Sequence, residues 1–200
     1  MPETQRQKQK NLTRKNIIET AMQVFEERGF LNTPTSVIAK AANVSHGTVF
    51  MHFKTQEELL TAVLEEFGSR INKRLHELAQ GKSGMREVLE AHIAGLAEFE
   101  KFYTGLVVEG GVLPKAARNT FTAIQSTVSI HISQAAEEEI AKGRIKQIPL
   151  HMIFNGWVGL VHYYLANKDL FSPEGPVLKR YGGELVLNYM ALLEPGDGRP

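Results

Sequence analysis

Residues 33–53 read TPTSVIAKAANVSHGTVFMHF, a short helical pattern, a break and a second short helical pattern. Thr33 can cap the first helix, and Pro34 suits its first position because no N–H is needed there. Asn43 marks the break, since asparagine tolerates a left-handed backbone better than most residues. Ser45 can then cap the second helix. The stretch therefore predicts two short helices joined by a tight turn.

The side chains of this stretch suit a helix-turn-helix that reads DNA. Ala39 is small where the helices would cross, and Ile38 and Val49 are apolar enough to hold them together. Short or polar groups open the second helix, where a recognition helix meets base edges. Lys54 and Thr55 follow where phosphate contacts are expected, Thr55 at a helix N-terminus that attracts anions. The predicted DNA-contacting residues are Thr33, Thr35, Ser36, Ser45, His46, Gly47, Thr48, Phe50, His52, Lys54 and Thr55.

Other interpretations of this segment stay open from the residues alone. The three-helix module can pack on something other than DNA, because short motifs mislead readily. Gly47 can serve close packing, and Phe50 can lie in the core. The basic residues near the N-terminus either touch phosphates or form a solvated, disordered arm; they are Lys8, Lys10, Arg14 and Lys15.

Charge is distributed unevenly along the chain. The 200 residues carry 23 Lys and Arg against 22 Asp and Glu, a net charge of +1. Residues 1–54 hold eight of the basic and four of the acidic residues, whereas residues 55–200 hold 15 basic and 18 acidic ones. The balance excludes a histone-like polycation, an acidic solvating protein and a disordered polyampholyte. A basic segment joined to an acidic remainder indicates an anionic partner for residues 1–54.

Helical periodicity continues on both sides of this stretch, and no convincing strand pattern occurs. Residues 12–28 repeat apolar side chains at helical spacing and stop at Gly29. We expect an all-α fold of about nine helices. Further helices are predicted at about 55–78, 85–103, 114–142, 148–167 and 174–193, with an irregular or briefly helical connection at 104–113.

Residues 14–60 resemble the DNA-binding segment of the TetR family. The first motif is Ile17-Ile18-x-x-Ala21-x-x-x-Phe25-x-x-x-Gly29-Phe30. The second is Thr33-x-x-x-x-Ile38-Ala39-x-x-Ala42-x-Val44-Ser45-x-Gly47-x-Val49-Phe50-x-His52-Phe53-x-x-x-Glu57-x-Leu59-Leu60. The motifs cover about a quarter of the chain, and the rest matches in helix count, order and length.

The resemblance implies an all-α homodimer with two domains. Residues 1–54 would form a helix-turn-helix DNA-binding domain with a basic N-terminal arm. Residues 55–200 would form a helical domain that binds a small effector and pairs through its last two helices, at about 148–167 and 174–193.

The sequence departs from the family pattern at three positions. Asn43 replaces the usual Gly, Phe50 the usual Tyr and Gln56 a frequent Lys. Phenylalanine cannot hydrogen-bond a phosphate, and glutamine removes a charge that could contact the DNA backbone. Operator binding is therefore expected to depend more on Lys54, His52 and the N-terminal basic residues.

Polar side chains on apolar helices are the candidate ligand contacts. His92 and His131 each lie in the apolar stripe of a separate predicted helix. Such a histidine is either a core residue bonded to a carbonyl or a polar anchor in a mostly apolar cavity. The aromatic residues line the cavity or pack in an ordinary core. The predicted ligand-binding residues are His92, Leu96, Phe99, Tyr103, Phe121, Ile124, Gln125, Val128, His131, Asn155 and Trp157.

Three further features of residues 55–200 are singled out. His151, Asn155 and His162 form a polar line on an otherwise apolar helix. Glycines at 156 and 159 on that helix would let a partner helix approach closely. Glu109 either points to water or meets a cationic ligand.

Catalytic and metal chemistry find no support in the sequence. No glycine-rich phosphate loop follows a strand, no nucleophile elbow occurs, and Glu137-Glu138-Glu139 resembles a solvated helix face. The absence of cysteine excludes disulfides and Cys-based zinc sites, and histidines alone lack a carboxylate at ligand spacing. We expect no enzyme, no cofactor and no metal.

No targeting or membrane segment is expected. Residues 1–11 are polar and basic and lead into no apolar segment, unlike a secretory signal. The longest apolar stretch, residues 152–166, is shorter than the roughly 20 residues that a membrane span needs. We therefore expect a cytoplasmic protein with no membrane partner.

The predicted function is a transcriptional repressor released from a palindromic double-stranded DNA operator by a small, mostly apolar effector. Its two DNA-binding domains would meet half-sites whose centres lie roughly 34 Å apart. The alternative is a DNA-binding architectural or protein-docking factor of the same fold with no small-molecule effector. Titrating small molecules against an operator complex separates the two.

Overall fold

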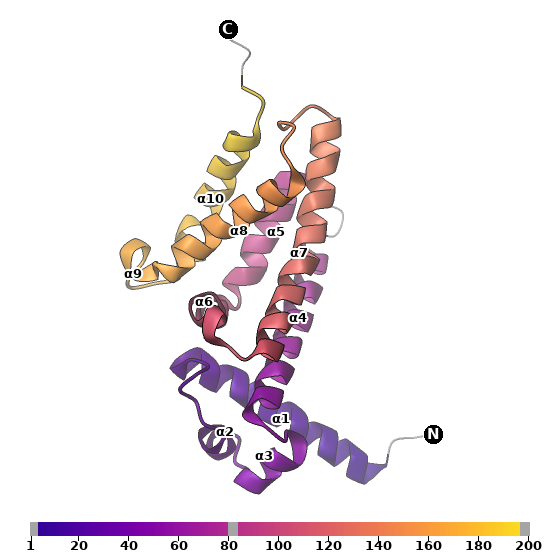
Figure 1. Cartoon of the computed structure of the whole chain (residues 1–200), viewed down its shortest axis with the longest axis vertical. Helices are drawn as coiled ribbons and strands as arrows, with labels where there is room; N and C mark the ends of the chain where they lie inside the picture. The colour runs from indigo at the N-terminus through magenta and orange to yellow at the C-terminus, as the bar shows by residue number, and fades with distance from the viewer. Residues whose placement is uncertain (1–3, 80–83, 197–200) are drawn as a thin grey trace. The chain divides into compact units, whose positions relative to one another are not determined.

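The computed structural model describes residues 4–79 and 84–196, which are α-helical with one short 3-10 turn and no strand (Figure 1). The predicted all-α fold is confirmed. The helices are α1 (Gln5–Arg28), α2 (Thr35–Ala41), α3 (His46–His52), α4 (Gln56–Ala79), α5 (Met85–Ala97), α6 (Glu100–Glu109), α7 (Lys115–Ala141), α8 (Leu150–Ala166), α9 (Lys168–Phe171) and α10 (Val177–Leu193), with the 3-10 turn η1 at Gly110–Val112.

Helix boundaries differ from the prediction in two places. The single helix expected over 85–103 is two helices, separated by a turn at residues 98 and 99. Much of the connection expected at 104–113 is the second half of α6, followed by η1.

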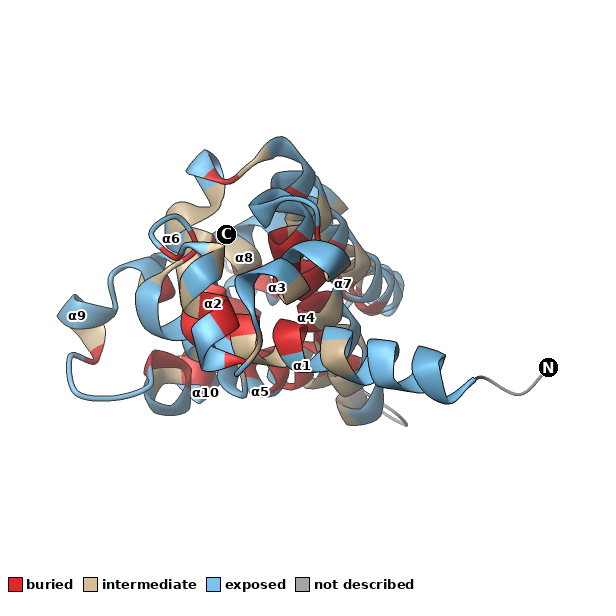
Figure 2. Ribbon diagram, turned by 90° about the horizontal axis from the view of Figure 1, so that it is seen from below, coloured by how far each residue is buried: buried red, intermediate tan, exposed pale blue. Residues whose placement is uncertain are grey.

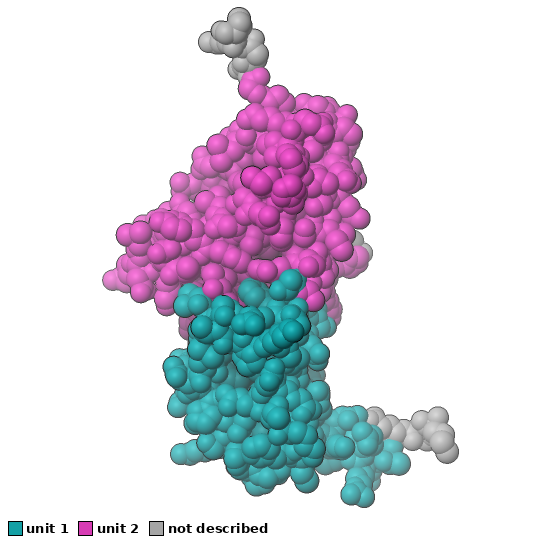
Figure 3. Space-filling view, viewed as in Figure 1, with its two compact units in different colours: residues 1–69, 108–122 teal, residues 70–107, 123–200 magenta. Residues whose placement is uncertain are grey.

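The chain forms two compact units, coloured separately in Figure 3. Unit 1 comprises residues 1–69 and 108–122, and unit 2 comprises residues 70–107 and 123–200. Helices α4, α6 and α7 therefore each begin in one unit and end in the other. The division of functions at residue 54 stays a prediction; unit 1 takes in the first part of α4 and residues 108–122 as well.

The core of unit 1 forms where the apolar faces of α1, α2 and α3 meet. Ile17 and Phe25 of α1 are buried, together with Ile38 of α2 and Val49 of α3. Figure 2 shows that α1 is exposed over its N-terminal part and buried only further along. Helices of seven residues are marginally stable on their own, so α2 and α3 depend on the burial of these side chains for their stability.

The N-terminal basic residues lie on a helix, which corrects the expectation of an arm. Helix α1 begins at Gln5 rather than at Leu12, and the Thr4 hydroxyl accepts the N–H of Gln7 at its N-terminus. Side-chain pairs such as Gln7 Nε2 to Asn11 Oδ1 (3.2 Å) support this exposed first part.

Two left-handed residues set the turns between the first helices. Gly29 follows α1 with φ 82° and donates its N–H to the Phe25 carbonyl, so a glycine ends the helix as predicted. Asn43 has φ 54°, which confirms the predicted left-handed turn between α2 and α3. The Ser45 hydroxyl accepts the N–H of Thr48 (3.0 Å), which confirms Ser45 as the cap of α3.

In unit 2, α5 and α10 pack closely through a glycine. Gly182 of α10 is buried, and a Cβ atom placed on it would overlap the Cγ2 methyl of Ile93 on α5. On α8, a Cβ on Gly156 would lie 3.0 Å from the Tyr189 hydroxyl, whereas Gly159 has nothing within 4 Å. The predicted close approach therefore occurs at Gly156.

A glutamate holds each end of α6. In unit 2, the Glu100 carboxylate accepts the N–H groups of Val177 (2.6 Å) and Leu178 (2.8 Å), at the start of α10. In unit 1, the Glu109 carboxylate accepts the N–H groups of Phe30 (3.1 Å) and Leu31 (3.1 Å). Glu109 therefore points neither to water nor to a ligand, because unpaired backbone donors after α1 attract it.

No helix in the described ranges is both long enough and apolar enough to cross a bilayer.

Candidate nucleic-acid interface and ligand site

The outward face of α2 and α3 brings together three of the predicted DNA-contacting residues. Thr35 Oγ1 and His46 Nε2 are hydrogen-bonded at 2.9 Å, which joins the two helices. The His46 ring meets the Phe50 ring edge-on, with centroids 4.7 Å apart. Phe50 is 40% exposed, so it does not lie in the core, and Ser36 is exposed on α2. The face combines a polar pair with an apolar ring, the chemistry that base edges and thymine methyl groups require.

Most of the other predicted contacts on α3 lie at its N-terminus, whereas His52 is its last residue. His46 and Gly47 are exposed, and a Cβ on Gly47 would meet only the Ser45 hydroxyl, at 3.8 Å. Gly47 therefore does not serve close packing within the described residues. The hydroxyls of Ser45 and Thr48 lie 2.8 Å apart and complete the cap.

Thr33 is not available to DNA, which corrects its prediction as a contact. It is 0% exposed, and its hydroxyl donates to the Gly29 carbonyl (2.7 Å). It does not cap α2 either, because Pro34 occupies the N-cap position. Its role is to fix the connection between α1 and α2.

A capping box begins α4. The Thr55 hydroxyl accepts the N–H of Glu58 (3.0 Å), and the Glu58 carboxylate accepts the N–H of Lys54 (2.7 Å). The predicted cap at Thr55 is confirmed. Lys54 is exposed, so its ammonium group remains available to an anion while its backbone is held.

A groove of about 970 Å³ lies between the first part of α1 and α3. Its lining carries Arg6 and Lys10 from α1 and His52 and Lys54 from the end of α3 and beyond. The Nδ1 atom of His52 is buried without a hydrogen-bond partner among the described residues. Burial, and then the charges of Lys10 and Arg14, lower the pKa of His52. An anion in this groove would meet the three cations that line it, Arg6, Lys10 and Lys54.

A buried histidine–tryptophan pair lies in unit 2. Trp157 of α8 is 0% exposed and donates its Nε1–H to Nδ1 of His92 on α5 (3.0 Å). His92 is 4% exposed. Its burial, with a smaller contribution from the charge that His162 would carry, lowers the pKa of His92 to about 4. Both predicted residues are therefore close together, and the imidazole is neutral near pH 7.

A second polar chain joins α6, α7 and α8. The Tyr103 hydroxyl and His162 Nε2 are 2.8 Å apart, and Gln125 also hydrogen-bonds Tyr103. Burial raises the pKa of Tyr103 well above its usual range and lowers the pKa of His162 to about 4. Because both groups are uncharged at neutral pH, the chain is a set of neutral donors and acceptors.

Two of the predicted ligand contacts lie on the exposed faces of their helices. His131 is exposed, and its neighbour Ile132 is 0% exposed, so α7 turns a face offset by one residue toward the core. Asn155 is exposed two residues before Trp157, because Ile153, Trp157 and Val161 form the buried stripe of α8. His151 is exposed as well, so of the predicted polar line only His162 is partly buried, and His151 and Asn155 face water.

The other predicted ligand contacts lie in or beside the core. Leu96, Ile124 and Val128 are buried, and Phe99, Phe121 and Gln125 are partly buried. His162 and Tyr189 were not among the predicted contacts. The sequence signal for His162 is its place on an apolar helix five residues after Trp157. Tyr189 carried no such signal; its ring lies 5.3 Å from that of Trp157, and its hydroxyl donates to the Ile153 carbonyl.

Comparison with known proteins matches residues 17–63 to a protein family. A model of bacterial regulatory proteins of the tetR family matches residues 17–63, from the buried part of α1 into α4. A fatty acid metabolism regulator protein of Bacillus subtilis is 33% identical over 94 residues, 45% of this chain and 48% of that protein. The chain thus matches about half the length of this relative.

Solved structures extend the likeness of fold to nearly the whole chain. The fatty acid degradation regulator FadR from Bacillus halodurans superposes with a TM-score of 0.71 and 19% identity, covering 94% of this chain and 97% of that one. A TetR-family regulator from Agrobacterium tumefaciens gives a TM-score of 0.76 at 16% identity, with coverages of 93% and 100%. Residues 17–63 thus match the tetR family, and the described chain shares its fold with these solved structures.

Two departures from the TetR-family pattern have visible consequences in unit 1. Gln56 donates its Nε2–H to the Thr33 carbonyl (3.0 Å), so it ties the start of α4 to the connection before α2. Phe50, in place of tyrosine, lies against His46 on the outer face. From the sequence, Gln56 was expected only to remove a charge; the structure shows that it also hydrogen-bonds the Thr33 backbone.

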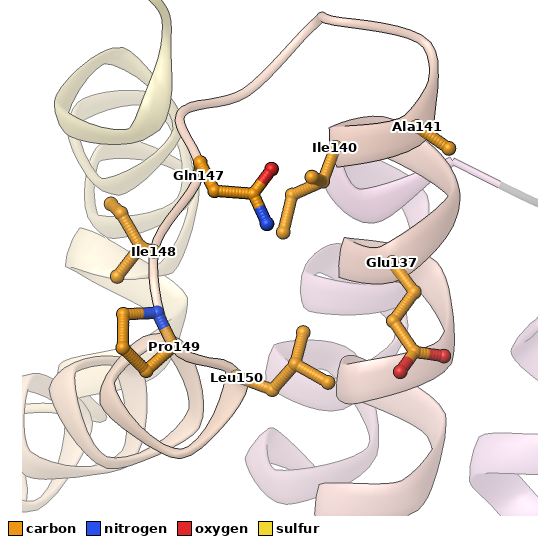
Figure 4. A pocket seen from close by; sticks show the side chains of 7 residues that line it. All are labelled: Glu137, Ile140, Ala141, Gln147, Ile148, Pro149 and Leu150. Atoms are coloured by element: carbon orange, nitrogen blue, oxygen red, sulfur yellow. The ribbon is translucent and has the colours of Figure 1, made fainter.

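One further pocket lies in unit 2. It is lined by Glu137, Ile140, Ala141 and residues 147–150, between the end of α7 and the start of α8 (Figure 4). It contains none of the predicted ligand contacts. Among residues 4–79 and 84–196, no group of three or more His, Asp or Glu is arranged to hold a metal ion.

Proposed function

We propose that this TetR-family chain is a cytoplasmic transcriptional repressor that binds a palindromic operator as a homodimer. A small, mostly apolar effector that binds in unit 2 would release it. The observation that carries the proposal is the α2–α3 face, where the partly exposed Thr35 contacts the exposed His46 and His46 contacts the exposed Phe50. A recognition helix inserted in the major groove reads bases with such a surface.

The groove between α1 and α3 supports phosphate binding beside that surface. Arg6 and Lys10 line it from α1, and Lys54 lines it from the start of the next segment. Each cation that neutralises a phosphate releases counterions, so binding should weaken steeply with salt. The basic residues near the N-terminus belong to this proposal as backbone contacts.

Exposed apolar side chains on the last long helices support the dimer. Met152 and Tyr163 of α8 are each 56% exposed, and Leu187 and Leu192 of α10 are 56% and 67% exposed. Exposed large apolar residues also occur on other helices, but these four lie on the two helices that the resemblance implies for pairing, and an apolar patch there would suit an interface. We propose that residues 148–167 and 174–193 pair with the same residues of a second copy.

The relatives and the interior of unit 2 support an apolar effector. Two similar proteins are named as regulators of fatty acid metabolism or degradation. The His92–Trp157 pair and the Tyr103–His162 pair supply neutral polar groups among apolar side chains. An effector that prefers the conformation with weak DNA affinity shifts operator binding about 5- to 150-fold, for a coupling of about 1–3 kcal/mol.

The first test is selection of operator sequences from random double-stranded DNA, followed by gel-shift titration. We expect one palindromic sequence to be preferred. His46→Ala should lower the discrimination against mismatched operators, by about 1–3 kcal/mol at the base it contacts. Lys54→Ala should weaken binding to all sequences and reduce the slope of log affinity against log salt by about one unit.

Lys73→Ala is the matched control, because that exposed lysine on α4 lies outside the predicted interface. Selection that recovers no sequence in preference to random DNA would overturn the proposal. An operator complex that no small molecule releases would instead favour an architectural or protein-docking factor.

A further inference from the structure

Glu109 lies where the dipole of its own helix disfavours a carboxylate. It is the last residue of α6, and the C-terminus of a helix carries partial negative charge. Its oxygens instead accept the N–H groups of Phe30 (3.1 Å) and Leu31 (3.1 Å), the two residues that follow Gly29. Hydrogen bonds from N–H groups to a carboxylate are roughly twice as strong as neutral ones. The contact with this backbone is therefore what favours a glutamate at the end of α6.

Gly29 leaves the space that the carboxylate occupies. A Cβ atom on Gly29 would lie 2.7 Å from Oε1 of Glu109, and its φ of 82° is one that residues with side chains rarely adopt. Phe30 is 2% exposed, and its ring lies 5.3 Å from that of Phe25. The carboxylate thus contacts a stretch of backbone that packing against α1 already restrains.

This stretch of backbone leads directly into α2. The Thr33 hydroxyl donates to the Gly29 carbonyl (2.7 Å), and the Thr33 carbonyl accepts the Nε2–H of Gln56 (3.0 Å). Thr35, the first residue of α2, is hydrogen-bonded to His46 of α3 (2.9 Å). Hydrogen bonds therefore connect the residues after α1 to both helices of the α2–α3 face.

A second carboxylate joins the same parts of unit 1. Glu57, in the first turn of α4, accepts the N–H of Ala116 (3.4 Å) near the start of α7. Glu57 directly follows Gln56, which is bonded to Thr33. The residues at the end of α6 and after it are therefore attached both before α2 and after α3, and all of these residues belong to unit 1.

We propose that Glu109 is a positioning residue of the DNA-binding unit. Its carboxylate fixes the connection before α2 and thereby holds Thr35 and His46 where they meet the bases. This inference rests on the proposed function, because operator binding is the activity that Glu109 affects. Removing a negative charge by itself strengthens DNA binding, whereas losing the correct placement of α2 weakens it. The two effects of replacing Glu109 therefore have opposite signs.

The test is gel-shift titration of the full chain and its variants with the selected operator and with random DNA of equal length. Glu109→Ala removes both bonds and leaves a good helix former in α6. If the arrangement that binds operator falls to about a tenth of its population, operator affinity falls roughly tenfold. Binding to random DNA should change less than about twofold, because the cations Arg6 and Lys10 lie on α1, before the connection.

Two further variants control for charge and for folding. Glu27→Gln removes the same charge from an exposed position of α1 and should bind operator like the wild type or slightly more tightly. Glu109→Gln keeps the length of the side chain and one acceptor oxygen, so its operator affinity should lie between those of the wild type and Glu109→Ala. Far-UV circular dichroism identifies a variant that does not fold; should Glu109→Ala be one, Glu109→Gln decides the comparison.

Backbone amide NMR without DNA gives a second measurement. We expect the amide protons of Phe30 and Leu31 to exchange with solvent at least about tenfold faster in Glu109→Ala than in the wild type. The amide signals of Thr35 and His46 should also shift. Glu27→Gln should leave all four signals unchanged.

Operator binding by Glu109→Ala that equals or exceeds that of the wild type would overturn the inference, as would unchanged signals of Thr35 and His46. Selection of no operator by the wild type would refute the proposed function, and the NMR comparison would still decide whether Glu109 positions α2. Equal operator binding by the wild type and Glu109→Ala would refute the inference alone.

Discussion

At the scale of the residue, burial of His92 couples the stability of unit 2 to pH. The pKa of His92 is about 4, below the ordinary value of 6.5 that applies to the unfolded chain. The unfolded state thus binds more protons between these values, so stability is complete above about pH 6.5 and is lost as pH falls toward 4. From pH 7 to pH 5 we expect a loss on the order of 2 kcal/mol from this residue. Urea unfolding followed by Trp157 fluorescence measures it; His92→Phe should remove about this share of the pH dependence, while His162, whose pKa is also lowered to about 4, keeps its own, and His131→Phe should leave the dependence intact.

At the scale of the element, the packing of α5 against α10 depends on one glycine. Gly182→Ala would force its new methyl group against the Ile93 methyl, and overpacking of this kind costs about 1–3 kcal/mol. Gly183 is the natural control, because it is exposed and a Cβ there meets nothing within 4 Å. Gly183→Ala should raise the free energy of unfolding by about 0.5–1 kcal/mol through helix propensity. Chemical denaturation of both variants checks the opposite signs; equal effects would show that the contact does not matter.

At the scale of the whole molecule, the proposed dimer brings two DNA-binding surfaces to one operator. Leu187→Glu places a charge on the exposed apolar face of α10. In a symmetric dimer the substituted residue lies in the interface twice, so the desolvation of the carboxylate is paid twice. We expect at least about tenfold weaker dimerisation and a matching loss of operator affinity. Analytical ultracentrifugation and gel shift measure the two effects. Ile130→Glu, at an exposed apolar position of α7, should remain dimeric, and a dimer that tolerates Leu187→Glu would refute this interface.

Local signals made the DNA-binding segment largely predictable from the sequence. Asn43, Ser45 and Thr55 each act within four residues of their own position, so turn and cap chemistry suffices to place them. Thr33 and Gln56 could not be placed in this way. They are bonded to each other across 23 positions of the sequence, and only the fold brings them together.

The ligand site was less predictable because one apolar pattern can fit two different faces of a helix. Ile130 and Ile132 flank His131, so the pattern of α7 is compatible with two faces, and packing against neighbouring helices decides between them. His92 and Trp157 were both expected in the site. Their hydrogen bond joins residues 65 positions apart, which no local pattern reveals.

The glutamates at the two ends of α6 have a consequence for how this helix can change length. Unwinding the last turn of α6 would carry Glu109 away from Phe30 and Leu31 and expose two backbone donors that follow α1. Unwinding the first turn would likewise uncap α10 at Val177 and Leu178. Any ligand that shortens α6 must therefore supply enough binding free energy to replace these charge-assisted bonds, which sets a minimum affinity difference between the two states.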